Sequence, residues 1–267
     1  MTQCAPFDLT AIRAGVEGGP WRSVDVVQQT GSTNADLVAR AAAGVPIGGT
    51  VLIAEQQTAG RGRNGRAWTT PARTQLAMSV GVDTAGVPAA AWGWLPLAAG
   101  VAVVDALQRA AGVTAGIKWP NDVVADGRKV AGLLAEVASA STVVLGMGIN
   151  ITVSGTDVDI TDPDALPVTS LLLLGVEEPD RTAVLLAVLD ELARRIDQWR
   201  TAGGAGLIAD YRVRSATIGS RVRAVMPGGR EVVGPARDVD DAGRLLVEDA
   251  GGTVAVAAGD VVHLRRA

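Results

Sequence analysis

The sequence is poor in the side chains on which many nucleophilic and metal-dependent enzymes rely. Its 267 residues include a single cysteine, Cys4, and a single histidine, His263. One cysteine excludes an intramolecular disulfide and fits a reducing compartment. One histidine and one cysteine also argue strongly against metalloprotease and cysteine-protease chemistry. His263 lies in the last expected strand, so we assign it no catalytic role.

The sequence also lacks a large excess of either charge, since 24 basic and 28 acidic side chains leave a net charge of −4. No overall basic field therefore attracts nucleic acid or an anionic membrane, and the arginines must act locally. The N-terminus lacks the basic and apolar regions of a signal peptide. The longest uncharged run, residues 84–104, is interrupted by Pro88, Gly93, Pro96 and Gly100. This pattern predicts a loop and a buried helix, not a membrane span.

What is present indicates a globular chain, because hydrophobic residues make up 48 % and charged residues 19 %. Apolar periodicity predicts helices at about residues 35–44, 96–111 and 181–199. In the last of these helices, Glu191 and Arg195 are one turn apart and are expected to pair. Between the helices, apolar runs predict buried central strands.

The pattern changes near residue 215, where short strands alternate with glycine-rich turns. Such a pattern is typical of a small barrel. The length of the chain also suits one large domain and one small one. We therefore divide the chain into residues 1–214 and 215–267.

The most informative stretch is residues 60–68, with the sequence GRGRNGRAW, directly after the apolar run 50–54. Glycine lets a backbone approach a ligand closely, and arginine offers a planar fork of donors for phosphate and carboxylate oxygens. The loop therefore predicts an anion-binding site, although a flexible basic turn in water would have the same composition. It matches neither a Walker A loop nor a dinucleotide fingerprint, because no Gly-Lys-Ser/Thr and no helix-forming run follows it.

Three more blocks follow in order: KWPND at 118–122, RKVAGLLAE at 128–136 and GMGIN at 146–150. Together with the loop they resemble the biotin protein ligases, and a weaker match continues in the C-terminal segment. The family's loop usually carries a second basic residue where this chain has Asn64.

The resemblance implies an α+β fold with a mixed central β-sheet flanked by helices, as in the class II aminoacyl-tRNA synthetase/biotin ligase-like catalytic domain. A small C-terminal SH3-like β-barrel is expected to follow it. Some members of the family also carry an N-terminal DNA-binding domain. Residues 1–20 are too few for a helix-turn-helix, so the chain resembles the short type and we expect no DNA binding.

The resemblance also implies the residues of the site. Ser32, Thr33 and Asn34 form the turn that begins the helix at 35–44. The resemblance implies that this turn binds the ureido ring of biotin, although helix capping alone explains its residue types. The expected biotin-binding residues are Ser32, Thr33, Asn34, Gln57, Arg61, Gly62, Arg63, Lys129 and Gly132. The expected ATP-binding residues are Gly60, Arg63, Arg66, Trp68, Asn121, Lys129 and Asn150. Asp122 is the candidate ligand for Mg²⁺.

Two of these expectations concern packing around the ligands. Trp68 is expected to stack on adenine. Gly146 and Gly148 are unfavourable within a strand unless something lies close to its backbone, and a nucleotide or biotin would explain them.

The implied activity is ATP-dependent activation of biotin as biotinyl-5'-AMP, then transfer to a lysine of a biotin carboxyl carrier domain of an acyl-CoA or pyruvate carboxylase. Lys129, Arg63 and Arg61 are the expected catalytic residues, because cations neutralise phosphate charge. ATP, biotin and Mg²⁺ are the expected cofactors, the expected location is cytoplasmic, no membrane partner is expected, and a homodimer is possible. Two alternatives stay open: a lipoate–protein ligase, which shares the fold, and a non-catalytic nucleotide- or RNA-binding regulator.

Overall fold

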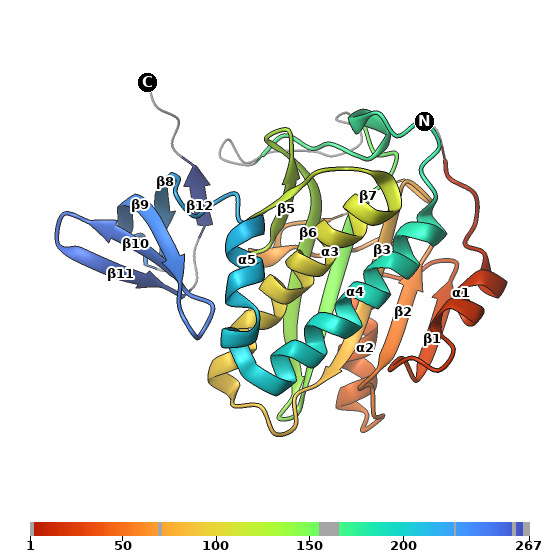
Figure 1. The fold of residues 1–267 in the computed structure, drawn as a ribbon. Helices are drawn as coiled ribbons and strands as arrows, with labels where there is room; N and C mark the ends of the chain where they lie inside the picture. The colour runs from red at the N-terminus through yellow and green to blue at the C-terminus, as the bar shows by residue number, and fades with distance from the viewer. Residues whose placement is uncertain (1–2, 69–70, 155–165, 227, 258–259, 264–267) are drawn as a thin grey trace.

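The computed structural model describes residues 3–68, 71–154, 166–226, 228–257 and 260–263. Within them the chain forms a large mixed sheet, flanking helices and a smaller sheet near the C-terminus (Figure 1). In spatial order, the strands of the large sheet are β1 (Ser23–Val27), β2 (Thr50–Ala54), β3 (Gln75–Asp83), β7 (Thr142–Asn150), β6 (Arg128–Ser139), β5 (Asp122–Ala125) and β4 (Gly116–Lys118). β1 and β2 run parallel, and the other neighbouring strands run antiparallel.

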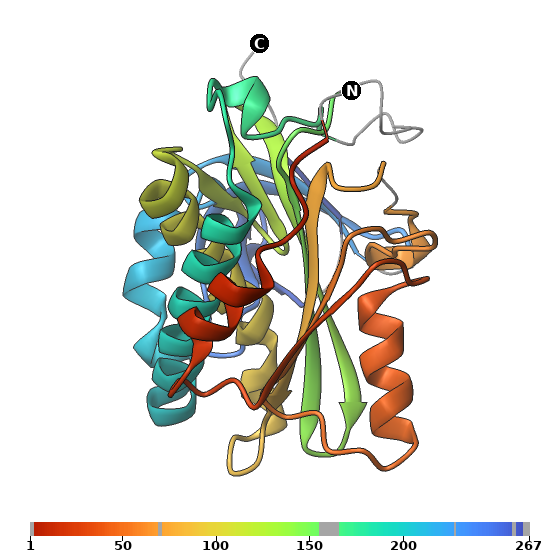
Figure 2. The ribbon, with the colours of Figure 1, turned by 90° about the vertical axis from the view of Figure 1, so that its right-hand side faces the viewer.

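The two faces of this sheet are covered differently (Figure 2). One face carries α1 (Leu9–Val16), α3 (Leu95–Ala111) and α4 (Arg181–Ala202), with α5 (Ile208–Arg214) beside α3. The other face carries α2 (Thr33–Ala42). Because a single helix covers only part of a wide sheet, the second face has room for loops and a site.

The most apolar segment of the chain belongs to the core. Residues Ala89–Ala111 are long and apolar enough to cross a membrane, but 67 % of their most apolar stretch is buried inside the protein. The segment consists of the 3-10 helix η2 (Ala89–Trp94) and α3, and the apolar residues of α3 pack on α4 and the sheet. It ends at Gly112, where a φ of 65° suits glycine.

The predicted pairing within α4 is wrong. Glu191 pairs with Arg194 at 2.6 Å, three residues away. Arg195 is only 1 % exposed, and its guanidinium donates to Asp105 of α3 at 2.7 Å. The reason is tertiary, because Arg195 lies on the packed side of α4, where α3 presents a carboxylate that local spacing does not reveal.

The C-terminal sheet has five antiparallel strands in the order β11-β10-β9-β8-β12. In chain order they are β8 (Arg221–Val225), β9 (Glu231–Val239), β10 (Leu245–Asp249), β11 (Gly252–Val256) and β12 (Asp260–His263). Two indoles join this sheet to the large domain, since Trp94 Nε1 donates to the Asp241 carbonyl at 2.9 Å and Trp119 Nε1 to the Gly243 carbonyl at 3.0 Å. The predicted fold class, a mixed sheet with flanking helices and a small C-terminal SH3-like β domain, is confirmed.

Candidate active site

Glycines line the face of the sheet that carries α2. Gly148 of β7 lies opposite Gly132 of β6, and Gly146 is two residues before Gly148 in β7. The side chains of the protein itself lie over two of these glycines, where we had expected a ligand. A Cβ on Gly146 would be 2.3 Å from Asn34 Oδ1, and one on Gly148 would be 2.3 Å from Trp68 Nε1. Both positions therefore need glycine because Asn34 and Trp68 pack directly on the backbone.

The turn that begins α2 lies against this face. Ser32 caps the helix, and its hydroxyl accepts from the Ala35 amide at 3.4 Å. The Thr33 amide donates to Gln57 Oε1 at 2.9 Å, and the Thr33 hydroxyl lies 3.0 Å from the same oxygen. Ser32, Thr33, Asn34 and Gln57 are all buried, so four predicted residues are brought together and the capping role is present as well.

Two further residues join this group, and the sequence analysis missed both. Ser79 of β3 donates to Asn34 Oδ1 at 2.6 Å and lies 2.6 Å from the Thr33 hydroxyl. Asn34 Nδ2 donates to Glu136 of β6 at 2.7 Å. A serine in an otherwise apolar run and a glutamate closing the block 128–136 were the available signals.

Residues 60–68 fold back on themselves as a short hairpin. The Gly62 amide donates to the Arg66 carbonyl at 2.7 Å, and the Trp68 amide donates to the Gly60 carbonyl at 2.8 Å. A Cβ on Gly60 would lie 2.1 Å from the Trp68 carbonyl oxygen, so closure of the hairpin requires glycine there. The side chains of Arg61 and Arg66 are exposed at the surface of the loop.

Arg63 is the loop arginine that reaches the sheet. It lies in the 3-10 turn η1 (Arg63–Gly65) and is half-buried. Its guanidinium donates to Asn121 Oδ1 at 3.3 Å. Asn121 Nδ2 donates to the Leu133 carbonyl at 2.8 Å, and the Leu133 amide donates back to the Asn121 carbonyl at 2.9 Å. The turn before β5 is thus fixed to β6, and it anchors the loop.

Trp68 closes the loop against the glycines. Its indole Nε1 donates to Gln75 Oε1 of β3 at 3.0 Å. The Lys129 ammonium lies 4.8 Å from the centre of the indole ring, a cation–π contact. Gln75, which sequence reasoning missed, therefore orients the tryptophan that we expected to stack on adenine.

A β-bulge directs Lys129 into the site. In the pairing of β5 with β6, Asp122 lies opposite Gly132 but Val124 lies opposite Lys129, so β6 carries one extra residue, Val130. The extra residue turns Lys129 to the side of Asp122 and Gly132. Lys129 Nζ then lies 2.6 Å from Asp122 Oδ1, with both side chains about four-fifths buried.

The last predicted residue, Asn150, is fully buried at the end of β7. Its Nδ2 donates to the Thr169 carbonyl at 3.0 Å and to the Lys129 carbonyl at 3.4 Å. Its Oδ1 has no hydrogen-bond partner among the described residues. Asn150 thus holds the backbone of Lys129 in place.

A buried ion pair, not expected from the sequence, supports the same end of the sheet. Arg181 donates to Glu55 at 2.6 Å and to the Gln75 carbonyl at 3.4 Å, and Glu55 accepts from the Phe7 amide at 3.0 Å. Arg181 is 2 % exposed and Glu55 6 % exposed. The pair fixes the start of β3, whose first residue holds Trp68.

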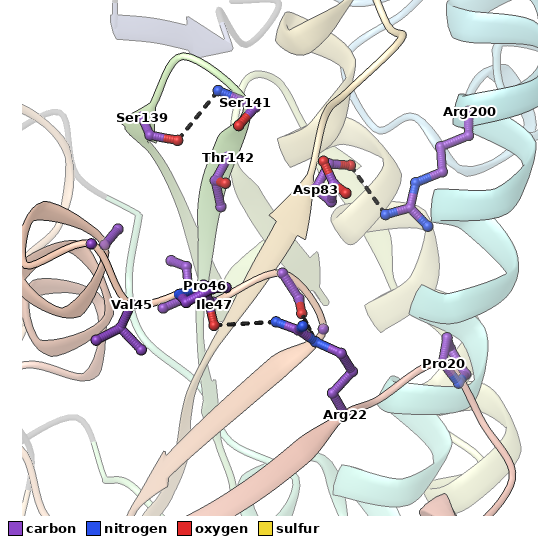
Figure 3. A pocket seen from close by; sticks show the side chains of 14 residues that line it. Pro20, Arg22, Val45, Pro46, Ile47, Asp83, Ser139, Ser141, Thr142 and Arg200 are labelled. Atoms are coloured by element: carbon purple, nitrogen blue, oxygen red, sulfur yellow. Dashed lines mark hydrogen bonds between the residues drawn. The ribbon is translucent and has the colours of Figure 1, made fainter.

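One of two cavities adjoins these residues. One of about 270 Å³ is lined by Arg63, Asn121 and Leu134 of the site region and by Ala242 of the C-terminal sheet. The other, of about 510 Å³, lies at the opposite end of the strands, around Arg22, Asp83 and Arg200 (Figure 3). None of the predicted site residues lines it, so the larger cavity is separate from the candidate site.

Known proteins with similar sequences share the regions that contain these residues. The model of the biotin/lipoate A/B protein ligase family matches residues 28–152, and that of the biotin protein ligase C-terminal domain matches residues 217–264. The chain is 59 % identical over 265 residues to biotin–[acetyl-CoA-carboxylase] ligase of Mycobacterium tuberculosis, covering 97 % of each chain. It is 33 % identical to the enzyme of that name from Paracoccus denitrificans, covering 88 % of this chain and 98 % of that one.

The fold is similar to that of biotin protein ligase from Aquifex aeolicus in complex with biotin and ATP. The TM-score is 0.76 at 24 % identity, over 92 % of this chain and all of that one. The matched regions contain the loop, the α2 turn, the Lys129 bulge and the C-terminal sheet. The chain therefore belongs to the biotin protein ligases of the biotin/lipoate A/B protein ligase family.

Proposed function

We propose that the protein joins biotin to a lysine of a biotin carboxyl carrier domain in two ATP-dependent steps, using the face of the large sheet that carries α2. One observation carries this assignment. A buried cluster of neutral hydrogen-bonding groups, at Thr33, Asn34 and Gln57, lies on the same face as the cations of Lys129 and Arg63. A neutral head group and a charged phosphate would each find a fitting environment there.

In the first step, a carboxylate oxygen of biotin attacks the α-phosphorus of ATP. The bond from the α-phosphorus to the bridging oxygen breaks, and pyrophosphate leaves. Lys129 neutralises the charge that develops on the α-phosphate, with Arg63 and Arg61 from the loop. Asp122 holds Lys129 in place beforehand, because the two are 2.6 Å apart.

In the second step, the neutral ε-amine of the carrier lysine attacks the carbonyl carbon of the mixed anhydride. The amide bond forms, AMP leaves with the electron pair of the broken C–O bond, and the amine loses a proton. The loop keeps water from the anhydride until the carrier arrives.

Biotin binds through the polar turn and the loop, by Ser32, Thr33, Asn34, Gln57, Arg61, Gly62, Arg63, Lys129 and Gly132. ATP binds beside it through Gly60, Arg63, Arg66, Trp68, Asn121, Lys129 and Asn150. The indole of Trp68 packs on the backbone of Gly148 beside Lys129, and adenine would stack on it.

Mg²⁺ accompanies the nucleotide. Among the described residues, no group of three or more His, Cys, Asp and Glu side chains forms a metal site. Asp122 offers a single carboxylate, which suits an ion held mainly by phosphate oxygens and water. When bound, Mg²⁺ would neutralise phosphate charge.

Two rival activities are disfavoured. A lipoyl group has no ureido N–H or carbonyl for the buried polar turn. The match of residues 217–264 to the biotin protein ligase C-terminal domain also favours biotin. A regulator that binds RNA is disfavoured by the net charge of −4 and by the confinement of the Arg/Gly repeat to one loop.

The remaining assignments complete the proposal. Residues 1–214 form the catalytic domain and residues 215–267 the SH3-like domain. The acceptor belongs to an acyl-CoA or pyruvate carboxylase. The protein acts in the cytoplasm without DNA or membrane partners, either alone or as a homodimer.

The test is a mass measurement on a purified biotin carboxyl carrier domain after incubation with the protein, ATP, Mg²⁺ and biotin. We expect the mass of one biotinyl group to be added, and no addition when ATP is omitted or when the acceptor lysine is replaced by arginine. Transfer of lipoate but not biotin would assign the rival activity, and binding of single-stranded RNA without any transfer would assign the regulator.

A further inference from the structure

A chain of hydrogen bonds, buried at Thr33, Ser79 and Asn34 and half-buried at Glu136, runs from the α2 turn along the same face of the sheet to β6. Thr33 and Ser79 have their hydroxyl oxygens 2.6 Å apart, Ser79 donates to Asn34 at 2.6 Å, and Asn34 donates to Glu136 at 2.7 Å. Its members come from α2, β3 and β6, and the amide of Asn34 lies on the bare backbone of Gly146. A packed amide with short contacts on both sides has a defined orientation.

Glu136, at one end of this series of hydrogen bonds, sets which group donates in each of them. An ionised carboxylate only accepts hydrogen bonds, so Asn34 must turn Nδ2 toward Glu136 and Oδ1 toward Ser79. The one hydroxyl proton of Ser79 then goes to Asn34. The 2.6 Å contact between Ser79 and Thr33 therefore uses the proton of Thr33. Gln57 Oε1 is the other acceptor within reach of the Thr33 hydroxyl, at 3.0 Å against 2.6 Å for Ser79, and it still accepts from the Thr33 amide at 2.9 Å.

We propose that Glu136 is a positioning residue for biotin, which sets the Thr33 hydroxyl as a hydrogen-bond acceptor toward a ureido N–H of the ligand. The proposal rests on the function proposed above and names what orients that part of the site. With its proton committed to Ser79, the Thr33 oxygen can offer the ligand only lone pairs. If Asn34 were reversed, Ser79 would donate to Thr33, so the Thr33 oxygen would keep one free lone pair instead of two and its proton would be free to turn toward the ligand.

Glu136→Leu removes the acceptor and lets the amide of Asn34 turn. We expect the dissociation constant for biotin, measured by calorimetry without ATP, to rise about 10- to 100-fold, the usual effect of losing a hydrogen bond to a charged group. The KM for ATP should stay within about twofold, because Glu136 contacts the biotin turn and not the loop. Glu136→Gln keeps a carbonyl acceptor for Asn34 and should restore most of the affinity. Glu231→Leu is the matched control, since Glu231 is an exposed strand glutamate paired with Arg223 at 3.0 Å.

A double-mutant cycle separates a connected chain from independent contacts. Ser79→Ala interrupts the same chain, so Ser79→Ala combined with Glu136→Leu should cost little more than either change alone. Additive losses, unchanged biotin affinity in Glu136→Leu, or equal losses for biotin and ATP would each overturn the proposal. If Glu136→Leu does not fold, Ser79→Ala and Glu136→Gln test the proposal. Weaker biotin binding in Ser79→Ala together with near-normal binding in Glu136→Gln supports the proposal, and any other result overturns it. If the wild-type protein itself fails to bind biotin, the function proposed above has failed instead.

Discussion

The two glycines that flank Arg61 differ sharply in what surrounds them, which makes a matched pair of alanine substitutions informative. In Gly60→Ala the new Cβ would lie 2.1 Å from the Trp68 carbonyl oxygen and 2.9 Å from Gln57 Nε2. The carbonyl is backbone, so it can retreat only if the hairpin opens. Ordinary contact requires a shift of roughly 1 Å or more. In Gly62→Ala the nearest atom lies at 3.6 Å, an ordinary contact, and φ is −100°.

The shift at Gly60 breaks the bond from the Trp68 amide to the Gly60 carbonyl, which is 2.8 Å long and closes the hairpin. Trp68 then loses its position on Gly148 and its bond to Gln75 at 3.0 Å. A misplacement of about 1 Å in a positioning element costs on the order of 10²-fold in rate. We therefore expect biotinyl-adenylate formation to fall about 100-fold in Gly60→Ala. In Gly62→Ala it should fall by no more than about twofold, because Gly62 can contact biotin only through its backbone and the added methyl group has room.

The assay is single-turnover release of pyrophosphate with saturating biotin and ATP, and thermal unfolding of both variants serves as the control for folding. The melting temperatures should differ little, because the hairpin lies outside the core. A wild-type rate in Gly60→Ala, or equal losses in the two variants, would refute the argument that Gly60 closes the hairpin and thereby positions Trp68.

Three further predictions concern the ion pair, the loop and the response to acid. Lys129→Ala should slow adenylate formation by about 10²–10³-fold, measured as pyrophosphate release, and a wild-type rate would remove Lys129 from the mechanism. Arg61 and Arg66 are exposed, and the contacts within the hairpin must offset an ordering cost of ~1–2 kcal/mol per residue. We therefore expect the hairpin to open often enough for trypsin to cut it in the unliganded protein, and biotinyl-adenylate to protect it; equal cleavage would contradict this. Burial raises the pKa of Asp210, but the hydrogen bond and charge of Arg195 outweigh it, and the net pKa is lowered. The stability that the Arg195–Asp210 pair contributes is present above the unfolded pKa of about 4 and is lost as pH falls through the lower folded pKa. Asp210→Asn should therefore lower the melting temperature at pH 7 and flatten its decline below pH 4. Identical plots of melting temperature against pH for the variant and the wild type would contradict the pairing.

The sequence was sufficient to predict the fold class, most of the elements and the residue types of the candidate site. Glycine and arginine in residues 60–68, the polar turn at 32–34 and Lys129 in the block 128–136 each indicate a function through their own side-chain types. Asp-Gly is a residue pair typical of a tight hairpin turn, and Asp126 and Gly127, between β5 and β6, both have the positive φ that such a turn requires. Such features are local, because they depend on residues a few positions apart.

Only the tertiary structure shows which side chains pack on the glycines of β7. Their presence indicated a close approach to the backbone, but not by what. Asn34 and Trp68 come from segments about 110 and 80 residues away in the sequence, and only the packing of α2 and the loop on the sheet brings them over Gly146 and Gly148.

The sequence by itself determined which residue types could bind a neutral ring and a phosphate, and in which order they occur along the chain. The tertiary structure decided which of them meet. The extra residue at Val130 turns Lys129 toward Asp122, and the register of β3, β7 and β6 places Ser79 and Glu136 on either side of Asn34. The physical reason is that a strand shows one side chain in two to each face, so a bulge or a shift of register by one residue exchanges what the site contains, and neither is visible in local spacing.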